Sequence, residues 1–164
     1  MTQNYNRSSG TLNTNDYNAP TGGYTTPSSD CTTSFSGLCN YDNIYGGYYD
    51  WDTATANTDI SSYDICPRSW RLPTQKEFTN LITKDGYTDG ARLTSSPAYM
   101  QYGGLCRPSG LACADSSGSN GLGSYWSSSS SESNSYNLVF TSSYAVISIN
   151  NKNRGYSVRC VFGS

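Results

Sequence analysis

Six cysteines are the residues whose type and spacing most directly predict covalent chemistry in this sequence. They occur in a chain rich in Ser, Asn and Tyr, at Cys31, Cys39, Cys66, Cys106, Cys113 and Cys160. An even number of cysteines in such a chain is typical of disulfide bonds formed in an oxidising compartment. Cys31 and Cys39 flank one short loop and Cys106 and Cys113 flank another, which leaves Cys66 to pair with Cys160. The alternative is six free thiols.

Acid–base and metal chemistry have few candidate residues. The sequence contains no His, which removes the usual general base near neutral pH and the commonest metal ligand. Glu77 is assigned to a helix cap, and Asp115 and Glu132 lie in separate loops without an acidic partner at a meaningful spacing. A Ca²⁺ site requires a cluster of carboxylates that this pattern does not supply. We therefore expect no catalytic residues, no metal ligands and no cofactor.

Non-covalent recognition has stronger candidates in the last quarter of the chain. Tyr combines a large rigid contact area with a small loss of side-chain entropy, and Ser and Asn supply adaptable hydrogen bonds, as they do in antibody loops. The alternative interpretation is an exterior that is polar only for solubility. We expect the ligand-binding residues to be Ser129, Asn134, Asn137, Val139, Thr141, Ser143, Tyr144, Ser148, Asn150, Asn151, Asn153 and Tyr156.

The composition narrows the class of protein. A length of 164 residues suits one domain with a real core. Hydrophobic residues make up only 35%, a level seen in disordered chains, but the 15 Tyr and three Trp bury large areas and favour a folded domain. The net charge of −2 comes without a basic patch, so nucleic acid is not an expected partner. No run approaches the roughly 20 apolar residues of a membrane span, so we expect no membrane insertion.

The elements that must position these residues indicate an α+β fold with long loops. Residues 1–44 are interpreted as a polar leader or arm carrying one disulfide loop. A strand is expected at 48–51, followed by a short helix or turn near 53–57. The clearest helix follows Pro73, where Thr74 and Glu77 form a capping box. Its apolar stripe is Phe78, Leu81 and Ile82, and Asp85-Gly86 ends it.

The C-terminal part alternates in the manner of a small antiparallel sheet. Residues 86–124 are expected to be mostly loop, and 129–134 a loop at the edge of the sheet. Strands are expected at 137–141, 145–149 and 156–162, with a polar turn at 150–154. In the first strand Leu138 and Phe140 would point into the core, which leaves Asn137, Val139 and Thr141 on the other face.

Four sequence motifs resemble a known family. They are CPRSWRLPTQKEF from Cys66, YWSSS from Tyr125, YNLVF from Tyr136 and GYSVRCV from Gly155. Together they resemble the Fibrobacter succinogenes major paralogous domain over roughly residues 45–162. The resemblance implies a C-type-lectin-like fold, allied to the formylglycine-generating-enzyme-like fold, over residues 45–164. The chain is also similar to variable proteins of diversity-generating retroelements, in which the C-terminal segment, here 125–161, is rewritten at adenines.

The resemblance implies a display protein and not an enzyme. The related enzymes act through paired cysteines, which have no counterpart here once Cys66 is joined to Cys160. The motifs of calcium-dependent lectins are missing. Four residues are interpreted as structural residues that hold the fold, here called the frame, with ligand contact as the alternative. They are Trp70, Arg71, Trp126 and Arg159.

We therefore expect a monomeric protein, extracellular or on a cell or virion surface, that binds a protein or glycan partner through its C-terminal sheet face. The alternative is a structural surface-layer or appendage domain without a specific ligand.

Overall fold

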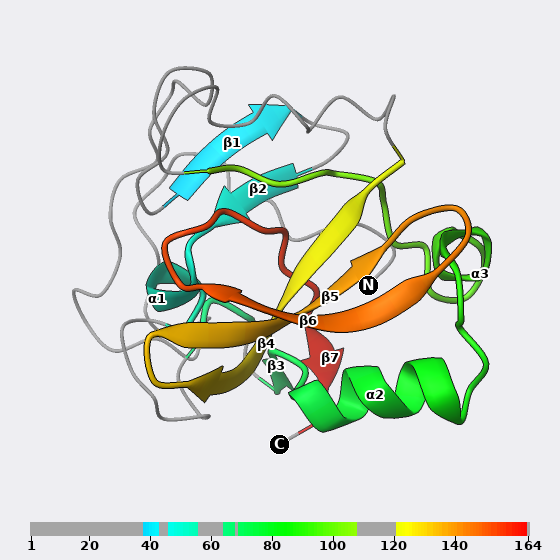
Figure 1. The fold of residues 1–164 in the computed structure, drawn as a ribbon. Coiled ribbons are helices and arrows are strands. Elements are labelled where there is room, and N and C mark those ends of the chain that lie inside the picture. The colour runs from blue at the N-terminus through cyan, green and yellow to red at the C-terminus, as the bar shows by residue number, and fades with distance from the viewer. Residues whose placement is uncertain (1–37, 43–45, 56–63, 68, 108–120, 164) are drawn as a thin grey trace.

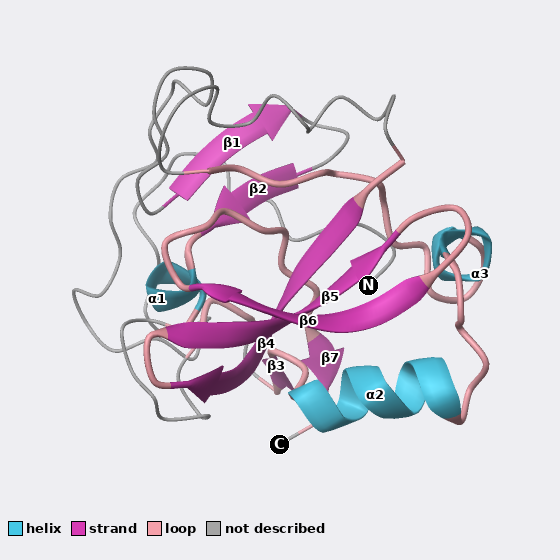
Figure 2. Ribbon diagram, viewed as in Figure 1, coloured by secondary structure: helices cyan, strands magenta, loops and turns pink. Residues whose placement is uncertain are grey.

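A computed structural model describes residues 38–42, 46–55, 64–67, 69–107 and 121–163 (Figure 1). The elements within these ranges are small antiparallel strands and a few helices, so the fold class is α+β (Figure 2). In chain order they are β1 (Leu38–Asp42), β2 (Gly46–Tyr49), α1 (Trp51–Ala54), β3 (Trp70–Arg71), α2 (Gln75–Thr83), α3 (Gly90–Thr94), β4 (Gly123–Ser131), β5 (Asn134–Phe140), β6 (Ala145–Asn151) and β7 (Val161–Phe162).

The sheet that carries the C-terminal motifs has the strand order β4-β5-β6. One of its faces, here called the helix face, packs against α2 and α3. Leu138 and Phe140 are fully buried there with Tyr125, and Phe78 and Leu93 approach them from the helices. The sequence predicted that Leu138 and Phe140 enter the core and that Phe78 begins the apolar stripe of α2, and the structure packs the two against each other.

The other face of the sheet covers a second core. Trp126 packs there against Tyr156 with ring centroids 4.3 Å apart, beside Trp51, Leu72 and Val158. The Trp126 indole donates a 2.7 Å hydrogen bond to the Tyr49 carbonyl, and the Trp51 indole donates one to the Ser127 carbonyl. Because both faces of the sheet are packed, residues on either face can be buried.

A wide bulge interrupts β4. Trp126 pairs with Asn137 and Ser130 with Ser135, so three serines of β4 lie opposite the single residue Tyr136. Side-chain hydrogen bonds replace the backbone hydrogen bonds that β4 and β5 lack at this point. The Ser127 hydroxyl donates to the Tyr136 carbonyl, and the Ser135 hydroxyl donates to the Ser129 carbonyl. Small hydroxyl side chains are what this bulge needs, which gives the YWSSS motif a structural explanation.

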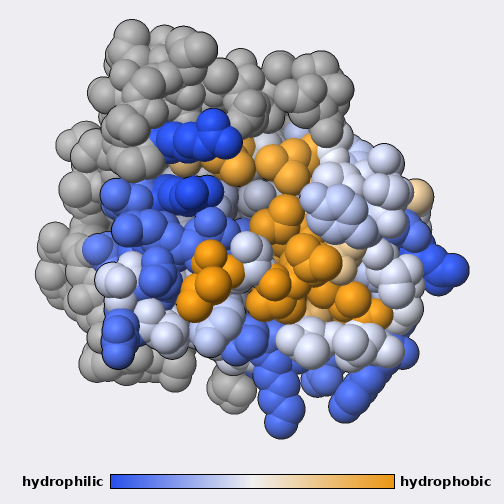
Figure 3. All heavy atoms as spheres, viewed as in Figure 1, coloured by the Kyte–Doolittle hydropathy of each residue, from blue (hydrophilic) through white to orange (hydrophobic). Residues whose placement is uncertain are grey.

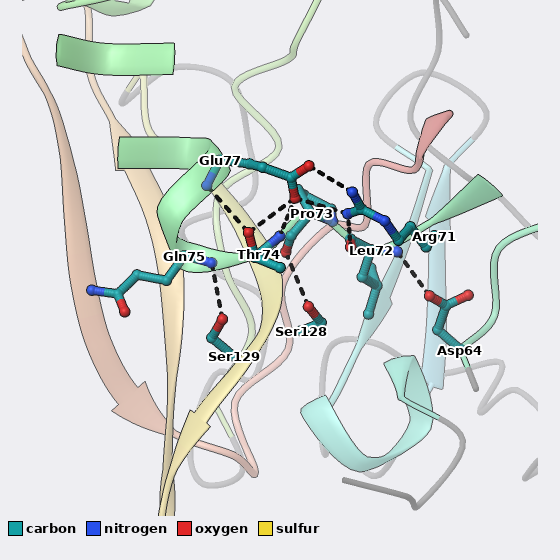
Figure 4. Close-up of polar contacts among 9 residues, drawn as sticks. All are labelled: Asp64, Arg71, Leu72, Pro73, Thr74, Gln75, Glu77, Ser128 and Ser129. Carbon is teal, nitrogen blue, oxygen red and sulfur yellow. Dashed lines mark hydrogen bonds and ion pairs between the residues drawn. The ribbon is translucent and has the colours of Figure 1, made fainter. Parts of the chain in front are cut away.

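The same bulge fixes the start of α2, as Figure 4 shows. The Ser128 amide donates to the Pro73 carbonyl, and the Gln75 amide donates to the Ser129 hydroxyl. Thr74 caps the helix, because its hydroxyl accepts from the Glu77 amide while the Glu77 carboxylate accepts from the Thr74 amide. The predicted capping box is confirmed, and α2 ends at Thr83 shortly before Gly86, whose φ is +76°.

Arg71 joins this corner to the rest of the frame. Its guanidinium forms a two-pronged ion pair with Glu77 at 2.7 and 2.8 Å and also donates to the Leu72 carbonyl. The pairing lowers the pKa of Glu77 to about 2, chiefly through the hydrogen bonds from Arg71. The buried Asp64 carboxylate accepts from the amides of Leu72 and Cys66. These side-chain contacts to backbone amides and carbonyls therefore fix the described backbone between Asp64 and Glu77.

The predicted Cys66–Cys160 disulfide is confirmed, and it closes a span of 94 residues. Near it, β3 pairs with β7, and the Trp70 ring meets Phe162 edge-on at 5.6 Å. Cys106 is disulfide-bonded as well. Its predicted partner Cys113, like Cys31 of the other predicted short-loop pair, lies outside the described residues.

Two sequence-based expectations about elements are wrong, and two others hold only in part. Trp51 begins α1 instead of ending a strand, because Asp50 accepts from the Thr53 amide and starts a helix there. Of residues 129–134, which were expected to form a loop, only Glu132 and Ser133 form a turn, and the others are the ends of β4 and β5. The segment 156–162 forms only short bridges and β7, and it does not extend the three-stranded sheet. The described residues of 86–124 are mostly loop, as expected, but they also contain the short helix α3 and the start of β4.

The expected domain boundary at 44 and 45 falls between β1 and β2, which pair as a hairpin. The last residues of the expected leader therefore pair with the first strand of the expected domain.

Candidate ligand-binding surface

The strand β6 forms an edge of the three-stranded sheet, since only β5 pairs with it in the described part of the chain. Its seven residues span about 20 Å. Exposed side chains occur on both of its sides, whereas most residues of the supporting strands β4 and β5 are buried or half-buried. An exposed strand on a rigid two-stranded base is the arrangement that can present side chains to a partner.

Several of the expected residues lie at the two ends of β6. At one end, the turn from β5 brings Thr141, Ser143 and Tyr144 together. The Thr141 hydroxyl lies 3.3 Å from the Ser143 hydroxyl, and Tyr144 is 44% exposed. At the other end, the Asn153 amide donates to the Asn151 side chain, and Asn151 pairs with Asn134 of β5.

Between these ends, Val139, Ser148 and Asn150 share the face opposite α2, as the sequence alternation predicts. All three are half-buried. The Asn150 side-chain amide bridges neighbours on that face, because it donates to Asn137 at 2.9 Å and to Ser148 at 3.1 Å.

Two of the expected residues are not on the surface. Asn137 is fully buried, because Trp126 lies beside it on β4 and the second core covers that face. Tyr156 is 1% exposed and packs at a tilt against the Trp126 ring, and burial raises the pKa of its phenol. Alternation correctly predicted which face Asn137 occupies, but it could not show that this part of the face is covered. Both residues belong to the frame.

Ser129 is also used by the frame. It lies in β4, and its hydroxyl accepts from the first backbone amide of α2. A ligand would have to compete with this hydrogen bond.

Sequence reasoning missed two exposed residues, Val146 and Ile149, which are 45% and 49% exposed on opposite sides of β6. Apolar residues in a strand are usually assigned to the core, and the sequence does not reveal that β6 is an edge. One signal was present: Val146, Ile147 and Ile149 occupy both parities of the strand, so they cannot all face one core.

These observations define what is here called the β6 surface. Figure 3 shows apolar atoms gathered across the centre of this side of the molecule, bordered by hydrophilic atoms. The surface comprises Asn134, Val139, Thr141, Ser143, Tyr144, Val146, Ser148, Ile149, Asn150, Asn151 and Asn153.

The β6 surface combines apolar contact with neutral hydrogen bonding. Residues 141–151 carry no charged side chain. The next residue in the sequence, Lys152, directs its ammonium to the Trp51 ring, 4.1 Å from the ring centre. In the part of the chain that the structure describes, no cluster of Cys, Asp and Glu could hold a metal ion. The surface can therefore provide recognition through shape, apolar area and hydrogen bonds.

The residues predicted to belong to the frame are buried or half-buried, or form hydrogen bonds within the protein. Trp126 is fully buried. The Arg159 guanidinium donates to the carbonyls of Ala98 and Tyr99, and burial lowers its pKa. Trp70 is half-buried against the second core.

Among the described helices, none is long and apolar enough to cross a membrane. Comparison with protein-family models, curated proteins and solved structures finds no match to this chain.

Proposed function

We propose that this chain is a ligand-binding display protein and that the β6 surface recognises a macromolecular partner, either a protein or a glycan. The observation that carries the proposal is the separation of frame from surface. The motif residues Trp126, Leu138 and Phe140 are fully buried, whereas Tyr144, Val146 and Ile149 are 44–49% exposed on the adjoining strand β6 and in the turn before it. Such an arrangement lets the exposed side chains change without loss of the fold.

The residue types suit recognition. Tyr144, Val146 and Ile149 would supply apolar anchors, and the surrounding Ser and Asn would adjust hydrogen bonds to the partner. The proposal includes the family suggested by the motifs, a C-type-lectin-like domain of the Fibrobacter succinogenes major paralogous type and a retroelement variable protein. It also includes an extracellular, cell-surface or virion-surface location, which the Cys66–Cys160 disulfide supports. Function would need neither metal nor catalysis.

A combined variant tests the surface. Tyr144, Val146, Ile149 and Asn151 are changed together to Ser, and the purified protein is compared with the natural chain on arrays of glycans and of surface proteins. Signals given by the natural chain should disappear. The control variant changes the exposed residues Lys76, Thr83 and Phe162 to Ser, and it should give the same binding signals as the natural chain. Equal binding by both variants would place recognition outside the β6 surface.

A second candidate, a structural surface-layer or appendage domain, is favoured by one observation. The edge strand β6 lacks the charged residues, such as Lys, or Pro that commonly protect an edge from pairing with other chains. Size-exclusion chromatography with light scattering separates the candidates. A monomer at high concentration supports display, and concentration-dependent assembly abolished by Val146→Lys supports the structural role.

A further inference from the structure

A cavity of about 360 Å³ lies between the C-terminal end of α2 and the helix α3, and none of its lining residues belongs to the β6 surface. It is lined by Asp85, Gly86, Tyr87, Ala91, Arg92, Ser95 and Ser96. Its volume is at the lower end of the range of small-molecule sites. Asp85, Arg92 and Ser96 are exposed, so the cavity is open to solvent on one side.

The cavity brings together polar groups that the fold itself does not use. Within the described residues, neither the Arg92 guanidinium nor the Asp85 carboxylate has a hydrogen-bond or ion-pair partner, and the two do not pair with each other. Arg92 reaches toward the end of α2, since one guanidinium nitrogen lies 3.7 Å from the position of a Cβ added at Gly86.

The opposite side of the cavity is apolar and fixed. The Tyr87 side chain packs against the core beneath the helix face of the sheet, and its amide donates to the Leu81 carbonyl. Ala91 adds a methyl group from α3. The Ser95 hydroxyl is held by a 2.6 Å hydrogen bond to the Ala91 carbonyl and keeps its lone pairs for a ligand.

The hydrogen-bond donors and acceptors that line the cavity indicate which class of ligand it can bind. A guanidinium only donates and a carboxylate only accepts, so a ligand that satisfies both must carry acceptors and donors close together. An anion would be repelled by Asp85, and a cation by Arg92. Neighbouring hydroxyl groups both donate and accept without charge. A pyranose ring also has an apolar face that matches Tyr87 and Ala91, which a small zwitterion lacks.

We propose that this cavity is a second binding site and that it takes a neutral sugar unit, either free or at the end of a glycan. Arg92 and Asp85 bind adjacent hydroxyl groups, the side of the ring packs on Tyr87, and the rest of a glycan leaves through the open side. The site shares no lining residue with the β6 surface and needs no metal ion.

Nuclear magnetic resonance titration of the full chain tests the proposal. The probes are glucose, galactose, mannose and N-acetylglucosamine, with acetate and glycine as anionic and zwitterionic comparisons. At least one neutral sugar should shift the backbone resonances of residues 85–96. The dissociation constant should rise at least tenfold in Arg92→Ala, in Asp85→Asn and in Ala91→Trp, which fills the cavity from an exposed helical position.

The control is Lys76→Ala, which removes an exposed cation of α2 outside the cavity and should bind as the natural chain does. All variants change exposed side chains, and matching spectra outside residues 85–96 establish that each is folded. The proposal is overturned if no neutral sugar shifts these resonances or if only acetate or glycine does. It is also overturned if the response survives Arg92→Ala or Asp85→Asn, or is centred on β6.

Discussion

At the scale of single residues, the ion pair between Arg71 and Glu77 connects pH to stability. The pKa of Glu77 is about 2 in the folded protein, against an ordinary value of 4.5. A carboxyl whose pKa falls on folding stabilises the protein above its unfolded pKa, and this contribution is lost as the pH falls through the folded pKa. The Glu77 contribution should therefore be full above about pH 4.5 and disappear toward pH 2.

Changing Glu77 to Gln should remove this dependence. Glu77 is 41% exposed, so solvent screens the pair and its contribution should be about 1 kcal/mol, with a similar loss from the weakened cap. Urea unfolding of both proteins between pH 2 and 7 measures the difference. The gap in unfolding free energy should be constant above about pH 4.5 and narrow below it. A gap independent of pH would show that Glu77 acts only through the cap.

Asn137 illustrates how a residue predicted to bind ligand serves the frame instead. It is fully buried, and its side-chain oxygen accepts from Asn150 at 2.9 Å. Asn137→Asp places a carboxylate there without a cation to pair with in the described surroundings, and it should destabilise the protein by about 3–5 kcal/mol near pH 7. Asn151→Asp, on the exposed end of β6, should change stability by no more than about 0.5 kcal/mol. Thermal melts of the two variants measure this, and equal losses would contradict the assignment of Asn137 to the frame.

At the scale of elements, the sequence predicted the features that depend on neighbouring residues but not those that depend on residues distant in the chain. The capping box of Thr74 and Glu77 lies within four residues, so the sequence was sufficient to predict the start of α2. The side-chain alternation of β5 is also local, and it correctly assigned Leu138 and Phe140 to the core. The burial of Asn137 depends on Trp126 and Tyr156, which are distant in sequence, and no local pattern contains that information.

The strand β4 was missed for a different reason. The run Ser127–Ser131 has no alternation and weak strand propensity, and the sequence interpretation placed a loop over residues 129–134. It is extended because its hydroxyl groups complete the bulge and because Pro73 and Gln75 bind its backbone and side chains. The composition of the candidate surface changed as a result, because Ser129 belongs to the frame and not to the surface. In addition, β6 lies at an edge of the sheet and exposes Val146 and Ile149, which no sequence pattern assigned to the surface.

At the scale of the whole molecule, two cores on opposite faces of one three-stranded sheet hold the exposed strand in place. The helix face packs on α2 and α3, and the other face packs on the segment 156–158, which the Cys66–Cys160 disulfide ties to the chain before β3. Few charged groups take part, which agrees with the 13% content of charged residues. Stability therefore depends on aromatic burial and on covalent closure more than on ion pairs.

Replacing both Cys66 and Cys160 with Ala tests this dependence on covalent closure. The disulfide spans 94 residues, and the chain-entropy account of cross-links gives about 4–5 kcal/mol for a loop of that size. Because such a loss rivals the whole stability of a typical domain, the variant should unfold near or below body temperature. Calorimetry measures the loss, and hydrogen exchange locates it: protection should fall at Ser157 and Trp126, whose amides bond across the tied segment. A loss below about 1 kcal/mol would mean that aromatic packing alone holds the second core.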